Sequence, residues 1–451
     1  MSVVRSDGPV FTHGFGVDAR TGAPIDADSL FYLGSCTKTL TGLGVVLLAD
    51  RGLIDLDAPV QRYLPGFVLR DPKRSARVTV RHLLTHTSGL ATRSGFDRRA
   101  QEHVELSHLR FAHEPGERLE YSSLNFVVLG ALIEEVAGRR YATFLQRSVF
   151  EPLGMTRSFV ERVRAEEAGV VQGHTLFFGL PVPRTEPRYT DAMIPAGYVV
   201  SSARDVGRFL RMYLNGGRAM EGSVLSSWAV DETLARGPGA DEVETQRPLA
   251  LGRQRFHGHL AYGHAGMTPG FSARLMVLPD LDYGIAVLAA RNDGPFLPAY
   301  RDLMEGIMAR LAGVETRTPA QRWLWLRLAM LGLLAWSLIA FGRLVVRWWK
   351  RGRPRRILGR FGVLGRLVLR IGLTVGGTIF ILRAFAKMPL AALLEFYPDL
   401  GLLLVLGLLL VGPEAVLEAM VRSHDLLRRE RSPPASAVGD GRGAKREIVQ
   451  T

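Results

Sequence analysis

The sequence predicts an N-terminal domain of mixed α and β structure, followed by a membrane-embedded helical region. Three observations predict this arrangement. In residues 1–318, strand-like and helix-like segments occur with hairpin signals and without regular βαβ units. Residues 319–431 contain long apolar runs. The charge is also divided, because the first 318 residues hold 36 basic and 35 acidic residues, whereas the rest carries nearly all of the net charge of +14.

The elements of the N-terminal domain follow from local patterns. Residues 2–17 read as two strands joined by an Asp-Gly turn, and residues 36–52 as a helix that ends at a glycine. Residues 201–217 predict a helix opened by a capping box of Ser202 and Asp205. Further helices are expected at 80–86 and 122–138, and a final pair of strands at 270–290.

Three apolar stretches are predicted membrane spans. They lie within residues 323–349, 361–382 and 390–412. A helix needs about 20 residues to cross a hydrocarbon core of ~30 Å. Tryptophans at both ends of the first stretch suit the membrane interface and disfavour the alternative, a buried helix of a soluble domain. We therefore expect a lipid bilayer as a partner of residues 319–431 and a disordered tail over 432–451.

The basic residues predict the orientation of these spans. A dense basic loop lies at 347–360, and four arginines follow the third span between 422 and 431. Positive charge beside spans marks the cytoplasmic side, so the protein is expected to be multi-pass, with a cytoplasmic C-terminus and residues 1–318 outside the cytoplasm. Because the basic excess flanks apolar runs, it does not indicate a nucleic-acid partner.

The first residues do not resemble an export signal. They contain neither an apolar core region nor a cleavage site. A domain outside the cytoplasm requires such a signal, and the first expected strand begins almost at Met1. Either the predicted orientation is wrong, or the start of the chain is truncated, and we expect the second.

The choice of Lys38 is unusual in a sequence that otherwise uses arginine. The first 318 residues contain 34 arginines and only two lysines, Lys38 and Lys73. Lys38 lies one helical turn after Ser35, so its amine can reach the serine hydroxyl. A serine needs a base to become a nucleophile, and a buried lysine can lose its proton whereas an arginine cannot. The pattern alone is weak, because Ser-x-x-Lys also occurs by chance at polar helix starts.

Two further motifs strengthen this interpretation. Tyr121 stands just ahead of a predicted helix, where its hydroxyl could carry a proton between nucleophile and leaving group. His264 and Gly266 begin a predicted strand, and the glycine would let a substrate approach the backbone closely. The N–H group of Met267 could then pair with that of Ser35 as an oxyanion hole.

These three elements, in this order, resemble the serine penicillin-recognising enzymes, and their class C branch in particular. That branch comprises class C β-lactamases, D-alanyl-D-alanine carboxypeptidases, D-aminopeptidases and family VIII-type esterases. The stretches VTVRHLLTHTSGL and AGYVVSSARDVGRFL are also similar to it. The resemblance implies a β-lactamase/transpeptidase-like α+β fold, an antiparallel sheet flanked by helices with a helical subdomain, over about residues 3–310.

The resemblance also implies the roles of the site residues. Ser35 would be the acylating nucleophile, Lys38 its partner base and Tyr121 a proton carrier. His264, Gly266 and Met267 would line the substrate strand. No cofactor and no metal is implied; the pair His82 and His86 lacks the glutamate that a helical zinc motif requires.

One motif departs from the family pattern. After Tyr121 the family usually has an asparagine two residues on, and here Ser123 occupies that position. We expect Ser123 and Asn125 as substrate-binding residues, although Asn125 lies two residues further along and points elsewhere on the helix. Weaker positioning of the substrate amide counts against potent β-lactamase activity.

The sequence thus predicts a membrane-anchored serine hydrolase that acts on peptidoglycan-type peptides, β-lactams or small esters and amides. The alternative is a binding or sensing module that keeps the fold with little or no catalysis, of which Ser123 would be the mark.

Overall fold

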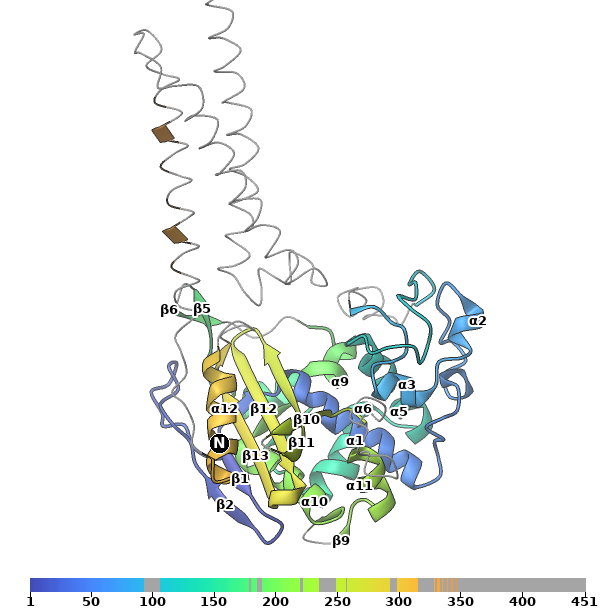
Figure 1. Ribbon diagram of the computed structural model, residues 1–451, viewed down its shortest axis with the longest axis horizontal. Helices are drawn as coiled ribbons and strands as arrows, with labels where there is room; N and C mark the ends of the chain where they lie inside the picture. Colours follow the sequence, from blue (N-terminus) through green and yellow to red (C-terminus); the bar gives the residue numbers. More distant parts are fainter. Residues whose placement is uncertain are drawn as a thin grey trace, which may run out of the picture. The chain divides into compact units, whose positions relative to one another are not determined.

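The computed structural model describes residues 1–92, 106–177, 180–184, 189–219, 222–234, 249–256, 258–292 and 298–314, with isolated helical positions between 328 and 346. The continuous segments belong to a first compact unit that contains residues 1–327, and the isolated positions belong to a second unit. Within the first unit the main sheet lies on one side, and α3, α5 and α6 lie on the other (Figure 1).

The main sheet is antiparallel and has six strands in the order β10-β11-β12-β13-β1-β2. This confirms the predicted antiparallel sheet. Its central strands pair along nearly their whole length, as apolar segments on a sheet covered on both faces should. The strands are β1 (Ser2–Val4), β2 (Pro9–Thr12), β10 (Gly252–Phe256), β11 (His259–Thr268), β12 (Phe271–Leu278) and β13 (Tyr283–Ala289).

The first hairpin agrees with the expected Asp-Gly turn, in which Arg5 and Gly8 exchange backbone hydrogen bonds of 2.7 and 3.2 Å. The second strand was expected to reach residue 17, but β2 ends at Thr12. The partner strand β1 begins at Ser2, so pairing continues past Thr12 only to His13, which exchanges backbone hydrogen bonds with Met1.

Helices cover both faces of this sheet. The helix α10 (Ala203–Leu214) packs against β1, β12 and β13 on one face. On the other face, Met308 of α12 (Pro298–Leu311) packs into a separate apolar cluster with residues of β1, β11, β12 and β13. The sheet is therefore buried between two layers of helix, the arrangement that the resemblance implies.

The helical subdomain is built around α1 (Thr37–Asp50), which is almost wholly buried and packs against α5, α9 and α11. The predicted helix ends agree with the structure: Gly52 and Gly138 have positive φ, a conformation that glycine adopts without strain. The other described helices are α2 (Pro72–Ser75), α3 (Val80–Leu84), α5 (Leu124–Ala137), α6 (Tyr141–Leu145), α7 (Glu151–Leu153), α8 (Arg162–Glu167), α9 (Ile194–Gly197) and α11 (Ser227–Leu234).

Besides the main sheet, the described residues form three small sheets of short strands. One small sheet has the order β3-β7-β4, another β14-β5-β6, and a third pairs β8 with β9. The first of these places β3 immediately before the segment that carries Ser35. The bounds are β3 (Leu30–Tyr32), β4 (Ser158–Phe159), β5 (Gly173–Phe177), β6 (Leu180–Arg184), β7 (Val200–Ser202), β8 (Arg218–Ala219), β9 (Gly222–Ser223) and β14 (Arg291–Asn292).

Half of the predicted capping box at α10 forms. The Ser202 hydroxyl accepts a hydrogen bond from the Asp205 N–H group at 3.2 Å. The Asp205 carboxylate accepts hydrogen bonds from the Arg157 N–H group and the Ser158 hydroxyl and pairs with Arg208. Tertiary partners thus occupy the group that a local cap would use.

The predicted spans at 323–349, 361–382 and 390–412 and the tail at 432–451 lie outside the continuously described residues. Within the described part of the chain, helices that combine the length and the apolar character needed to cross a bilayer are not found.

Candidate active site

Ser35 lies in a sharp connection between a strand and a helix. It is the middle residue of the 3-10 helix η1 (Gly34–Cys36), which follows β3 and leads directly into α1. Gly34 has a positive φ of 54°, and a Cβ at this position would lie 2.3 Å from the backbone nitrogen of Met267. The turn therefore needs glycine, and it presses the serine segment against β11.

Lys38 is fully buried beside Ser35. Its Nζ lies 3.3 Å from Ser35 Oγ and 3.4 Å from Ser123 Oγ, and it also donates to the carbonyl oxygen of Ala196 in α9. Burial lowers the pKa of Lys38 from 10.5 to about 7, because the charged ammonium loses its hydration. A substantial share of the amine is therefore neutral near pH 7 and able to accept a proton from the serine hydroxyl.

Tyr121 lies over the same amine. Its ring centroid is 5.1 Å from Lys38 Nζ and 6.0 Å from the ring of His264. Burial raises the pKa of Tyr121, and hydrogen bonding to Ser35 and Ser123 only partly opposes this effect. The phenol therefore stays protonated at neutral pH, where it can donate a proton to a leaving group.

The strand β11 forms the opposite side of the site. A Cβ at Gly266 would lie 1.9 Å from the carbonyl oxygen of Leu33, so the two backbones are in direct contact. Burial, followed by the charge of Lys38, lowers the pKa of His264 to about 4. Its Nδ1 lies 2.6 Å from the carbonyl oxygen of Ala265, which makes this nitrogen the donor and leaves a neutral imidazole with its other nitrogen as an acceptor.

Cys36 ties the nucleophile segment to β11. Its thiol is buried and donates to the carbonyl oxygen of His264 at 3.2 Å. Burial raises the pKa of this thiol to about 12, so it remains an uncharged donor. The contact spans residues that are far apart in the sequence, and no local pattern around Cys36 indicates it.

The structure brings together Ser35, Lys38, Tyr121, Ser123, His264, Gly266 and Met267, all of which the sequence predicted. Asn125 differs. Its side chain is fully buried, accepts a hydrogen bond from the Ser88 hydroxyl at 2.7 Å and lies 3.1 Å from Nδ1 of His86. Two residues of helix separate it from Ser123 by more than half a turn, so its amide faces Ser88 and His86 and not the amine of Lys38.

Two groups beside the site residues were not predicted from the sequence: the carbonyl of Ala196 and the side chain of His86. The carbonyl of Ala196 is a backbone group, which residue types do not reveal. The spacing of His86 and His82 indicates no role for His86 beyond the excluded zinc pair, and the two histidines have separate partners. His82 bonds to Thr79 at the start of α3, whereas the ring centroid of His86 lies 4.4 Å from that of Tyr121. Among the described residues, three or more metal-ligating side chains do not gather at any point.

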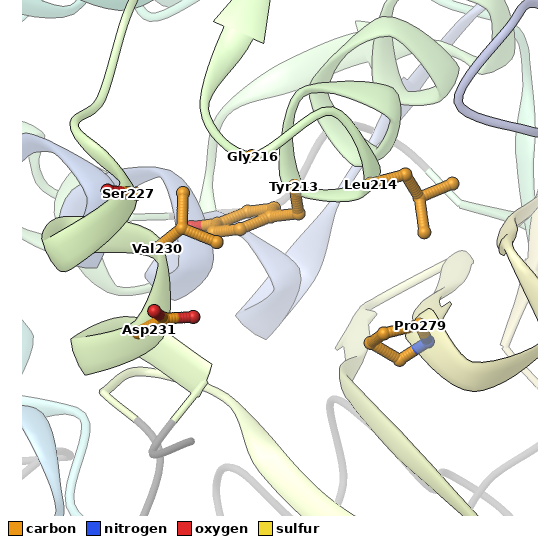
Figure 2. Close-up of a pocket in the computed structure, with 7 residues that line it drawn as sticks. All are labelled: Tyr213, Leu214, Gly216, Ser227, Val230, Asp231 and Pro279. Atoms are coloured by element: carbon orange, nitrogen blue, oxygen red, sulfur yellow. The ribbon is translucent and has the colours of Figure 1, made fainter. Parts of the chain in front are cut away.

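A separate cavity of about 210 Å³ lies between α10, α11 and the turn that contains Pro279 (Figure 2). It is lined by Tyr213, Leu214, Gly216, Ser227, Val230, Asp231 and Pro279. None of the residues around Ser35 contributes to it, so this cavity is distinct from the candidate active site.

Comparison with known proteins agrees with this geometry. The Beta-lactamase family profile matches residues 1–305. Penicillin-binding protein 4 of Amycolatopsis lactamdurans is 31% identical over 312 residues, which cover 65% of this chain and 80% of that protein. Protein flp of Staphylococcus aureus is 26% identical over 302 residues, and the match spans 64% of this chain but only 59% of that protein.

Solved structures agree as well. The octameric penicillin-binding protein homologue from Pyrococcus abyssi is 26% identical with a TM-score of 0.58, and the match covers 70% of this chain and 73% of that chain. The comparisons support a function of the serine hydrolase type. Because the family profile covers more than half of its residues, the chain belongs to the Beta-lactamase family.

Proposed function

We propose that the domain hydrolyses its substrate through an acyl-enzyme on Ser35. The observation that carries this proposal is the distance of 3.3 Å between Ser35 Oγ and the fully buried Nζ of Lys38, a base whose pKa burial lowers to about 7. The amine takes the hydroxyl proton as Oγ attacks the carbonyl carbon of the substrate.

The later steps use the groups around this pair. The Tyr121 phenol gives a proton to the departing nitrogen or oxygen, and an ester between Ser35 and the acyl group remains. The Lys38 ammonium returns its proton to Tyr121, which restores the neutral amine. A water molecule then attacks this ester while the amine of Lys38 takes its proton. The acid is released, and Ser35 Oγ regains its proton. The N–H groups of Ser35 and Met267 are proposed to bind the oxyanion in both acylation and deacylation.

The strand β11 supports an extended, peptide-like substrate. The neighbouring strand β10 pairs with residues 259–263 of β11, so its ladder stops before His264. The remaining half of β11 lies beside η1 and the nucleophile. A substrate backbone lying along this half could form strand-like hydrogen bonds with its carbonyl next to Ser35. We therefore favour peptidoglycan-type peptides, with β-lactams and small esters or amides as the other substrate classes.

A covalent probe tests the proposal. The full-length protein should be labelled by a fluorescent penicillin or by a fluorophosphonate, and the Ser35→Ala variant, with an unchanged melting temperature, should not. The competing proposal is a binding module with little catalysis, which the replacement of the usual asparagine by Ser123 favours. Folded wild-type protein that neither probe labels would support that module and end the hydrolase proposal.

The pH dependence of labelling follows from Lys38. Its neutral form is the base, so the labelling rate should increase about tenfold per pH unit below pH 7 and level off above it. His264 has a pKa of about 4, and the pKa of Tyr121 is raised. Neither group therefore titrates between pH 5 and 9, and neither should change the labelling rate in this range. Stopped-time labelling from pH 5 to 9 measures this profile. A rate that is flat across pH 7 would contradict Lys38 as the base.

We also propose that residues 319–431 anchor the domain to a membrane, with the domain outside the cytoplasm. Apolar runs flanked by basic residues support this proposal. Full-length protein should stay in the membrane pellet after carbonate extraction, and a chain that ends at residue 318 should not. Release of both by carbonate would overturn the proposed anchor and leave the hydrolase proposal untouched.

A further inference from the structure

His86 contacts three consecutive residues around the proposed proton carrier. Its carbonyl oxygen accepts a hydrogen bond from the Glu120 N–H group at 2.8 Å, and its Nδ1 accepts one from the Ser122 N–H group at 3.1 Å. Between them, the ring of Tyr121 lies 4.4 Å from the imidazole ring at a tilt of 31°. His86 is only 8% exposed, so these contacts are formed in the interior.

The hydrogen bonds determine the form of the imidazole. Nδ1 accepts from the Ser122 N–H group and also lies 3.1 Å from the amide nitrogen of Asn125. The Ser88 hydroxyl donates to the amide oxygen of Asn125, which turns the amide nitrogen toward His86. Because Nδ1 faces two donors, it cannot carry a proton, and the ring is neutral with its proton on Nε2. Burial, followed by the charge of Lys38, lowers the pKa of His86 and so also disfavours a second proton.

The backbone of His86 is unusual as well. Its φ is 57°, in the left-handed region that residues other than glycine seldom adopt, although histidine is found there more often than most residues. In this conformation the carbonyl oxygen of His86 accepts from the N–H group of Glu120, and its Nδ1 accepts from that of Ser122. These are the residues before and after Tyr121. Strain of this kind persists where the surrounding contacts hold it, and it is common at functional sites.

We propose that His86 is a positioning residue for catalysis: its neutral imidazole fixes the Ser122 N–H group and the ring of Tyr121, and thereby aims the phenol at Ser35 and Lys38. This inference rests on the proposed function. It assigns His86 no contact with the substrate.

Three variants of His86 test separately its Nδ1 as a hydrogen-bond acceptor and its ring as a contact of Tyr121. In His86→Asn the side-chain oxygen replaces Nδ1 as the acceptor for Ser122, and asparagine tolerates the positive φ. His86→Phe keeps a ring against Tyr121 but removes the acceptor. His86→Gly suits the backbone and removes both, which provides a second test if the phenylalanine variant does not fold. His82→Asn and His82→Phe are matched controls four residues earlier in the same segment.

We expect full-length His86→Asn to be labelled by the fluorescent penicillin, whose departing nitrogen takes the proton of Tyr121, within about threefold of the wild-type rate. His86→Phe and His86→Gly should lose about 10²-fold in the maximal labelling rate, because a misaimed proton carrier costs a factor of this order. The probe concentration at half-maximal rate should not change, and the His82 variants should keep the wild-type rate. A general loss of structure would instead follow the melting temperature and would not be relieved by asparagine alone.

Two results would overturn the assignment: a folded His86→Phe or His86→Gly protein labelled about as fast as wild type, or His86→Asn as slow as His86→Phe. Both presuppose a labelled wild type. Absence of labelling in the wild-type protein would instead overturn the proposed function, and this inference with it.

Discussion

Replacement of Lys38 by arginine is expected to abolish acylation of Ser35. Arginine keeps the positive charge but does not release its proton at any pH that the protein tolerates. Loss of a general base costs about 10²–10⁴-fold in rate. The wild-type amine is effective because it is fully buried, 3.3 Å from the serine oxygen, with a pKa lowered to about 7. A larger guanidinium in this place also cannot reproduce the contacts of Nζ with Ser123 and Ala196.

The chain offers a matched control for this experiment. Lys73, the only other lysine in the first 318 residues, is exposed in α2, so Lys73→Arg should label at the wild-type rate. Lys38→Met, which fills the same buried space without a charge, guards against misfolding of the arginine variant. Labelling rates and melting temperatures of the full-length proteins are the measurements. A folded Lys38→Met protein that acylates like the wild type would contradict the role of this lysine.

Replacement of Gly266 by alanine is expected to disable the site by a different route. The added Cβ would lie 1.9 Å from the carbonyl oxygen of Leu33 and 2.9 Å from the nitrogen of Cys36. Both are backbone atoms, so a side-chain rotation cannot relieve the overlap, and β11 has to move away from η1. A displacement of about 1 Å between reacting groups costs roughly 10²-fold in rate. Overpacking of this kind also destabilises a domain by about 1–3 kcal/mol.

Gly66→Ala is the control for this variant. Gly66 is an exposed glycine around which a Cβ would meet nothing within 4 Å, so its replacement should leave labelling and stability unchanged. We expect Gly266→Ala to lower the melting temperature and, at temperatures where it remains folded, to label about 10²-fold more slowly. Wild-type labelling by Gly266→Ala would show that the close contact between β11 and η1 does not matter for acylation.

Most of what the sequence predicted correctly depends on neighbours along the chain. The spacing of Ser35 and Lys38 is set by one turn of helix, which any helix with these residues would share. The end of α1 before Gly52 and the hairpin between β1 and β2 likewise depend on the conformations that a few adjacent residues prefer. The end of β2 at Thr12 depends instead on its partner strand, because pairing with β1 reaches only the contact between His13 and Met1.

The chemistry of the site was decided by contacts between distant segments. Lys38 becomes a base only because α5 and α9 bury it, and its partner at Ala196 is a carbonyl 158 residues away. The capping box at Ser202 stayed incomplete because Asp205 found partners at 157 and 158.

The sequence by itself thus determined the helices α1, α3, α5 and α10, the hairpins β1–β2 and β12–β13, the family and the residues that meet around Ser35. Only the tertiary structure decided the burial of Lys38, the orientation of Asn125 toward His86 and the contacts of His86 with the residues on both sides of Tyr121. The physical reason is that backbone preferences act over a few residues, whereas desolvation and hydrogen-bond partners depend on whatever the fold packs alongside.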